Sequence, residues 1–159
     1  MNDRVEEYQV KAAFLYNFAK FVQWPAGAFQ NPSEPIAICV LGQDPFGRSL
    51  EDTVTGRTID GRPLTVRNIS NIAQSARCHI LFVSSAEHKK SAPVLNEIKT
   101  PGVLTIGESS DSVAGGAVIN FRLESGKVRF DIDIEAAERE KLRISSRLLS
   151  LGHIVDPRK

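Results

Sequence analysis

The two cysteines, Cys39 and Cys78, carry the most reactive side chains of this chain. Two lone cysteines are typical of buried thiols in a reducing compartment, whereas in an exported protein they favour a disulfide. The cysteine count alone leaves both interpretations open. His79 follows Cys78 directly, but neighbours on a strand point to opposite faces. The two residues therefore form a poor nucleophile–base pair, and a structural role is favoured for both.

Charged residues near the end of the sequence offer two more candidate sites. Asp131 and Asp133 would share one side of a strand, which suits a carboxylate pair, but a solvated face with Asp133 as a helix N-cap is favoured. A ladder recurs every four residues, at Glu135, Arg139, Arg143 and Arg147. On a helix such a ladder is usually a solvated face, and the alternative is contact with an acidic partner or an anionic ligand.

Small polar residues follow the predicted buried strands at their carboxyl ends. They are Gln43, Asp44, Ser84, Ser85 and Glu108. The carboxyl ends of parallel strands meet at one edge, where open α/β sheets bind ligands. These residues mark a candidate small-molecule pocket, and the alternative is that they are only helix caps and turns.

The sequence lacks the motifs of the common enzyme classes. It has no P-loop, no G-x-S-x-G elbow and no Cys-x-x-Cys, and its three histidines lack metal-ligand spacing. A net charge of +1 does not indicate the positively charged surface that a nucleic-acid-binding domain has. No run of about 18 uncharged apolar residues could span a membrane. We expect no catalytic residues, metal, cofactor, nucleic-acid partner or membrane insertion.

The elements that position these residues alternate between strand and helix. Buried strands are predicted at 36–41, 79–84 and 103–106, another strand at 64–68, and a hairpin at 117–123 and 127–132. Helices are predicted from Asp44 to about residue 52, from Ser84 or Ser85 to about 99, and from Asp133 to Gly152. We expect a single α/β domain over 1–159, with a mostly parallel sheet flanked by helices. An antiparallel hairpin lies near the C-terminal edge of this sheet, and long helices lie at both ends of the chain.

The segment 8–25 (YQVKAAFLYNFAKFVQWP) predicts a helix that is more apolar than a surface helix needs to be. One stripe holds Tyr8, Ala12, Leu15, Ala19 and Val22, and a neighbouring stripe holds Phe14, Phe18 and Phe21. Together they cover about half of the circumference, so the helix requires two neighbours. Lys11 lies inside this apolar arc, where snorkelling is favoured and a buried charge pair is the alternative.

The opening segment resembles the start of the YfiR family of periplasmic proteins. The likeness continues through ICVLG (38–42), DPFG (44–47), CHILFVS (78–84), GVLTIG (102–107), Gly115-Gly116 and ISSRLL (144–149). It covers nearly the whole chain in order. The resemblance implies a non-enzymatic, dimeric and redox-responsive repressor of a membrane-bound diguanylate cyclase of YfiN type. Such a repressor lowers cyclic-di-GMP synthesis and biofilm formation, and an outer-membrane lipoprotein of YfiB type can sequester it.

The family relationship also implies a periplasmic location, with a signal peptide removed before residue 1, and a disulfide between Cys39 and Cys78. The region 113–120 lacks the second cysteine pair of the family. If residue 39 lies mid-strand and residue 78 starts a parallel neighbour in register, their Cα atoms are roughly 13 Å apart, beyond the reach of a disulfide. The bridge then requires staggered strands or a loop that folds back at Cys78, and otherwise the thiols stay free.

The resemblance suggests what covers the second apolar face of the first helix. One face is expected to pack on the sheet, and the other, with Lys11, Phe14, Phe18 and Phe21, to contact another subunit or a partner. A ligand-sensing module of a signalling system is the alternative function, with the carboxyl-edge residues as its pocket. An enzyme of unrecognised type is the third and least favoured interpretation.

Overall fold

The core of the fold is a mixed sheet, seen in a computed structural model that describes residues 3–71, 77–84, 102–108 and 117–155. Within these residues eight strands follow the order β10-β8-β7-β6-β5-β2-β4-β3. Their bounds are β2 Ile36–Leu41, β3 Thr58–Ile59, β4 Arg62–Ile69, β5 Ile80–Val83, β6 Leu104–Gly107, β7 Ile119–Glu124, β8 Lys127–Asp133 and β10 His153–Val155. The neighbouring strands β7, β6, β5, β2 and β4 are mutually parallel. The expected mostly parallel α/β fold is confirmed.

The central strands are buried on both faces, as their continuous apolar sequences predict. In β2, Ile38 and Val40 belong to one apolar cluster, while Cys39 and Leu41 belong to another on the opposite face. Every residue of β2, β5 and β6 is buried. The sheet therefore has two apolar cores.

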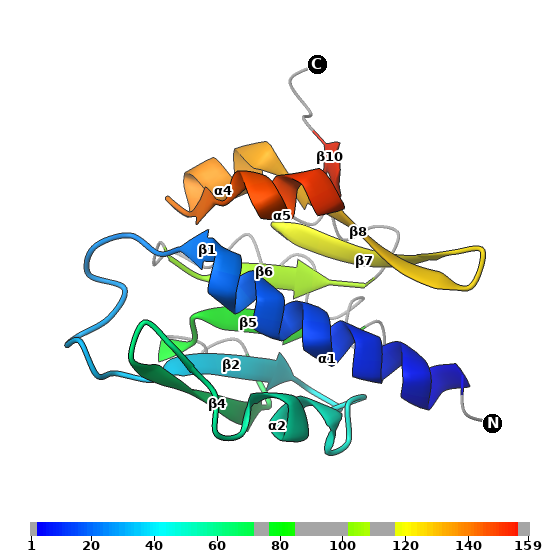
Figure 1. Cartoon of the computed structure of the whole chain (residues 1–159), viewed down its shortest axis with the longest axis horizontal. Helices are drawn as coiled ribbons and strands as arrows, with labels where there is room; N and C mark the ends of the chain where they lie inside the picture. Colours follow the sequence, from blue (N-terminus) through cyan, green and yellow to red (C-terminus); the bar gives the residue numbers. More distant parts are fainter. Residues whose placement is uncertain (1–2, 72–76, 85–101, 109–116, 156–159) are drawn as a thin grey trace.

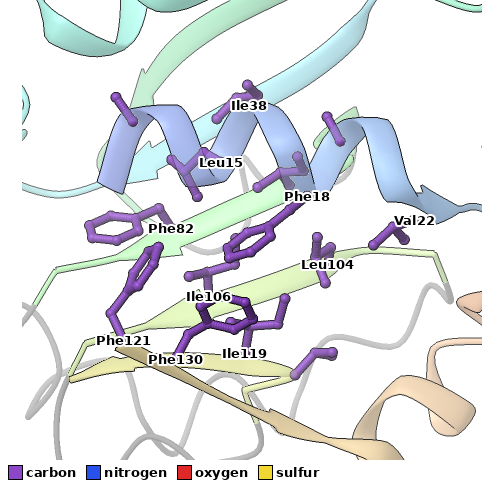
Figure 2. Close-up of a cluster of buried hydrophobic side chains, with 14 of the residues drawn as sticks. Leu15, Phe18, Val22, Ile38, Phe82, Leu104, Ile106, Ile119, Phe121 and Phe130 are labelled. Carbon is purple, nitrogen blue, oxygen red and sulfur yellow. The ribbon is translucent and has the colours of Figure 1, made fainter. Parts of the chain in front are cut away.

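Helix α1 (Asp3–Phe21) crosses one face of the sheet, as Figure 1 shows. Its predicted inner stripe is buried, with Leu15 at its centre. Phe18 also points into this core, toward Ile106 on β6 and Phe130 on β8 (Figure 2). A second helix, α2 (Ser49–Val54), packs beside α1 through buried Leu50 and Val54. No helix in the described part of the chain is long and apolar enough to cross a membrane.

Tight hairpins fix two of the antiparallel strand pairs. Asp60 and Gly61 join β3 to β4 with φ of 53° and 81°, and Ser125 and Gly126 join β7 to β8 with φ of 53° and 78°. Positive φ at both central residues is the signature of the two-residue hairpin turn that matches strand twist. The predicted β7–β8 hairpin is confirmed.

Three predicted helices are wrong in their bounds. The first ends at Phe21, where residues up to Pro25 were expected to continue it. The long C-terminal helix is instead α4 (Ile134–Arg139), the short strand β9 (Arg143–Ile144) and α5 (Ser146–Leu151). Lys141 adopts a φ of 59°, which ends the helical path, and β9 then pairs with β1 (Val22–Gln23) after α1. Likewise Gly47, with a φ of 59°, separates Asp44 from α2. The helix expected from Ser84 or Ser85 to about 99 lies outside the described residues.

Candidate functional site

The two cysteines form a buried disulfide between β2 and the residues that precede β5. Their Cα atoms are 5.9 Å apart across a sequence separation of 39. The sequence predicted a larger distance between these Cα atoms, because that prediction placed Cys78 at the start of a strand in register with β2. Cys78 lies before the strand, since β5 begins at Ile80. The bridge thus fastens the central strand to the entry of its neighbour.

Lys11 is part of a buried polar network and does not face a partner. Its side chain is 3% exposed, and its Nζ lies 2.8 Å from Glu108 Oε1 and also contacts Glu7. The Tyr8 hydroxyl donates to the Glu108 carboxylate at 2.8–2.9 Å. Lys11 Nζ also lies 4.6 Å from the centroid of the Tyr8 ring. Of the two interpretations of Lys11, the structure shows the buried charge pair.

The three phenylalanines assigned to a partner face divide into different environments. Phe18 is fully buried, and its ring lies 5.0 Å from that of Phe130. It cannot contact another subunit in this fold, so its assignment to that face is wrong. Phe14 and Phe21 are only partly buried and pack against the edge of the same core. The outer stripe of α1 is therefore narrower than the sequence predicts.

Phe14 lines an open groove between α1 and the β7–β8 hairpin. We call it the helix–hairpin groove and define it by Val10, Phe14, Leu123 and Val128. Its volume is ≈ 580 Å³, and Val10 and Leu123 are 44% and 55% exposed. Glu6, Glu7, Lys127 and Arg129 also line it. Exposed apolar side chains that gather in a hollow with a polar rim are typical of a protein-binding surface. The hairpin residues of this groove were not predicted, although Leu123 stands out as an apolar residue beside a turn.

Phe21 lies beside a second hollow, of ≈ 490 Å³, at the other end of α1. Lys20 and Arg143 line it, and the charged groups of Lys20 and Arg147 lie 5.6 and 5.8 Å from the centroid of the Phe21 ring. The predicted helical ladder of residues 135–147 does not form, because β9 interrupts it. Arg143 nevertheless lines this hollow together with Lys20 from α1, and Arg147 lies near its Phe21 ring.

The described carboxyl-edge residues lie in different environments. The Glu108 carboxylate is bound by Lys11 and Tyr8, and Asp44 accepts a hydrogen bond from the Phe46 N–H at 2.7 Å. Ser84 is buried, and its Oγ has no hydrogen-bond partner in the described part of the chain. Gln43 is exposed. Ser85 lies outside the described residues.

His79 lies at the amino ends of β2 and β5, and it has the structural role that the sequence favoured for it. Its Nδ1 accepts the Ala37 N–H at 3.0 Å, and its Nε2 lies 3.0 Å from the Ala28 carbonyl oxygen. The ring stacks on Phe29 with centroids 4.1 Å apart. Burial lowers the pKa of His79 below 6.5, partly offset by the Ala28 carbonyl and by Glu34.

The two C-terminal aspartates are also structural. Asp133 caps α4 by accepting the Ala136 N–H at 3.1 Å, which confirms the expected N-cap, and Asp131 accepts from Arg122 Nε at 3.0 Å. The expected solvated face is wrong, because Asp133 is buried and the Asp131 side chain is mostly covered. In the described residues, no group of three or more His, Cys, Asp or Glu side chains is placed to hold a metal ion.

Comparison with known proteins gives a family and related solved structures. A family model described as YfiR/HmsC-like matches residues 8–153. A solved structure of a conserved domain protein from Vibrio cholerae O1 biovar El Tor superposes with a TM-score of 0.61 at 11% identity, which shows a shared fold. The match covers 92% of this chain and 59% of that one. No curated protein matches the sequence. Because the family match extends over residues 8–153, this chain belongs to the YfiR/HmsC-like family, a family of periplasmic regulatory proteins of the cyclic-di-GMP pathway.

Proposed function

We propose that this protein is a periplasmic repressor that binds the periplasmic part of a membrane-bound diguanylate cyclase of YfiN type. The observation that carries the proposal is the family match over residues 8–153. Binding would hold the cyclase in a less active state and so lower cyclic-di-GMP synthesis and biofilm formation. The polar residues that the sequence offered as candidate sites support a non-enzymatic role, because Glu108, Asp131 and Asp133 all hold structural contacts.

The helix–hairpin groove is the surface that we assign to the cyclase. Phe14 belongs both to the outer stripe of α1 and to this groove. Val10 and Leu123 add exposed apolar area on either side. The core of a specific protein interface is apolar, with a polar rim, and the charged residues around this groove fit that pattern.

The disulfide is the feature that would make repression redox-responsive. It joins β2 to the chain before β5, so its reduction would release a cross-link between two central elements. Homodimer formation and capture by an outer-membrane lipoprotein of YfiB type belong to the same proposal, and family membership supports them.

A binding measurement with groove variants tests the proposal. The periplasmic part of a membrane-bound diguanylate cyclase of YfiN type is immobilised, and the protein is applied under oxidising and reducing conditions. We expect binding by the wild type and a loss of binding in Leu123→Asp and Val10→Asp. Leu151→Asp is the matched control, because Leu151 is also exposed but lies on α5, outside the groove. Failure of the wild type to bind in either condition would contradict the proposal.

Ligand sensing is the second candidate function, and the hollow beside Phe21 is the observation that favours it. Lys20, Arg143 and an aromatic ring meet there, a combination that suits an anionic ligand with a flat apolar part. A thermal-shift screen with nucleotides and amino acids tests this function. A uniformly flat response would argue against it.

A further inference from the structure

The imidazole of His79 stands between two main-chain segments that it holds together. Nδ1 accepts the N–H of Ala37 in β2, and Nε2 lies 3.0 Å from the carbonyl oxygen of Ala28, in the segment that precedes β2. A ring nitrogen that accepts an N–H bond carries no proton, so Nε2 must carry the hydrogen that is donated to Ala28. The observed contacts therefore require the neutral ring with its proton on Nε2.

The segment 26–35 is held against the sheet by this ring, by Arg62 and by Arg77, whose Nη1 donates to Gln30 Oε1 at 3.3 Å. Phe29 stacks on the imidazole at 4.1 Å with an interplanar angle of 15°. Arg62 lies 3.7 Å from the Phe29 centroid and donates to the carbonyl oxygens of Asn31 and Glu34 at 2.8 and 2.9 Å. Next to the segment, Trp24 Nε1 donates to the carbonyl oxygen of His79 at 3.1 Å.

Protonation of His79 is incompatible with one of these bonds. The added proton on Nδ1 would face the Ala37 N–H, and two donors cannot bond each other. The new charge would also lie against Phe29, on which the Arg62 guanidinium already rests. Ala37 is buried, so its N–H would lose its partner where water does not readily replace it.

The charged groups around the ring oppose one another. Glu34 Oε2 lies 3.3 Å from Nε2 and favours the charged ring, while Arg62 on β4 disfavours it. Arg67 on β4 and Arg77 before β5 line a hollow of ≈ 400 Å³ beside His79 and Glu34. Desolvation is the largest influence and lowers the pKa of His79 from 6.5. In the folded arrangement the pKa of His79 lies below that of an exposed histidine. As pH falls below 6.5, His79 therefore binds a proton more readily when it is exposed than when it is buried in these contacts, so acid favours its exposure.

We propose that His79 is an acid-sensitive clasp, whose protonation releases the segment 26–35 from the amino ends of β2 and β5. The clasp is independent of which partner the protein binds. It would expose the Trp24 and Phe29 side chains and open the edge of the sheet beside the disulfide.

Trp24 is the only tryptophan of the sequence and reports directly on this region. Its fluorescence emission and its quenching by acrylamide are measured from about pH 7.5 to about pH 4.5, the range in which histidines titrate. For the wild type we expect a red shift of the emission and a rise in the quenching constant, with a midpoint below the ordinary histidine pKa. Far-ultraviolet circular dichroism over the same range checks that the rest of the fold persists.

Three variants separate the clasp from other titrating groups. His79→Gln can accept from Ala37 and donate to Ala28 without titrating, so its quenching should stay constant with pH. His153→Gln removes a distant, exposed histidine and should behave as the wild type. Glu34→Gln removes the nearby negative charge and should move the midpoint to lower pH. A flat wild-type response, or an unchanged transition in His79→Gln, would overturn the proposal.

A measurement on the wild type covers the case in which His79→Gln does not fold. In nuclear magnetic resonance spectra, the His79 ring and the Ala37 amide should titrate together, with the amide signal moving as its hydrogen bond is lost. Titration of the ring while the Ala37 amide keeps its signal would overturn the clasp, as would a ring that stays neutral down to the acid unfolding transition.

Discussion

Lys11 Nζ and Glu108 Oε1 lie 2.8 Å apart although 97 positions separate the two residues in sequence. The contact fastens the N-terminal half of α1 to the carboxyl end of β6, and both side chains are 3% exposed. The Tyr8 hydroxyl reaches the same carboxylate. A buried charge pair of this kind is costly to break, because the remaining partner stays buried without its counter-charge.

We expect Lys11→Met to lower the free energy of unfolding by about 3 kcal/mol, because it removes the cation from a buried carboxylate. Urea denaturation of the purified variant measures this loss. Lys20→Met, on the exposed side of the same helix, is the matched control and should change stability by less than about 0.5 kcal/mol. Equal stability of the two variants would show that the pair is not energetically important.

Removal of the disulfide should destabilise the protein by roughly 4 kcal/mol, the chain-entropy value for a loop of this length. Thermal unfolding with and without a reductant measures the effect on the wild type. The double variant Cys39→Ala/Cys78→Ala should unfold at the lower temperature in both conditions. A wild-type unfolding temperature that does not respond to complete reduction would contradict this expectation.

Glu140 should cost the protein stability at neutral pH. Its burial raises the pKa of the carboxyl above 4.5, although the Val103 N–H donates to it at 3.2 Å. A carboxyl with a raised folded-state pKa is neutral in both states at low pH, and its ionisation penalises the folded state as pH rises through that pKa. Glu140→Gln should therefore be more stable than the wild type at neutral pH, with a difference that fades toward pH 4.5.

Urea unfolding at several pH values measures this difference, with the exposed Glu51→Gln as the control. A Glu140→Gln variant that is less stable than the wild type at neutral pH would mean that the charged carboxylate is favourable where it lies.

Gly152 lies so close to the core that it has no room for a side chain. A Cβ at this position would be 2.5 Å from Phe130 Cε2 and 3.1 Å from Ile132 Cδ1. We expect Gly152→Ala to destabilise the protein by about 1–3 kcal/mol through overpacking. Phe130→Leu should relieve part of this cost, so a double-mutant cycle should give a favourable coupling. Additive effects of the two substitutions would contradict the close contact.

The features that local sequence patterns predicted correctly are those that depend on near neighbours. The continuous apolar run of β2 predicts a strand buried on both faces, and Ser125-Gly126 predicts the hairpin turn. The inner stripe of α1 follows from helical periodicity, as buried Leu15 shows. Each of these signals is contained within a few residues of the element that it describes.

The features that the sequence did not predict depend on distant contacts. The long C-terminal helix was expected because its apolar spacing continues past Lys141, whereas pairing of Ile144 with Val22 imposes a strand there. Nothing near Lys11 indicates that its partner is Glu108. Phe18 was assigned to a partner face because periodicity cannot distinguish a core made by β7 and β8 from one made by another protein. The regulatory function came from the family resemblance, since no residue pattern encodes it.

Cyclase activity in the presence of this protein tests the proposed function most directly. A membrane-bound diguanylate cyclase of YfiN type is reconstituted in vesicles, with its periplasmic part outside and GTP inside. We expect cyclic-di-GMP production to fall as wild-type protein is added. Leu123→Asp should fail to reduce it, while Leu151→Asp should remain active as a repressor. Production that is unchanged at saturating wild-type protein, under both oxidising and reducing conditions, would contradict repression of the cyclase by this protein.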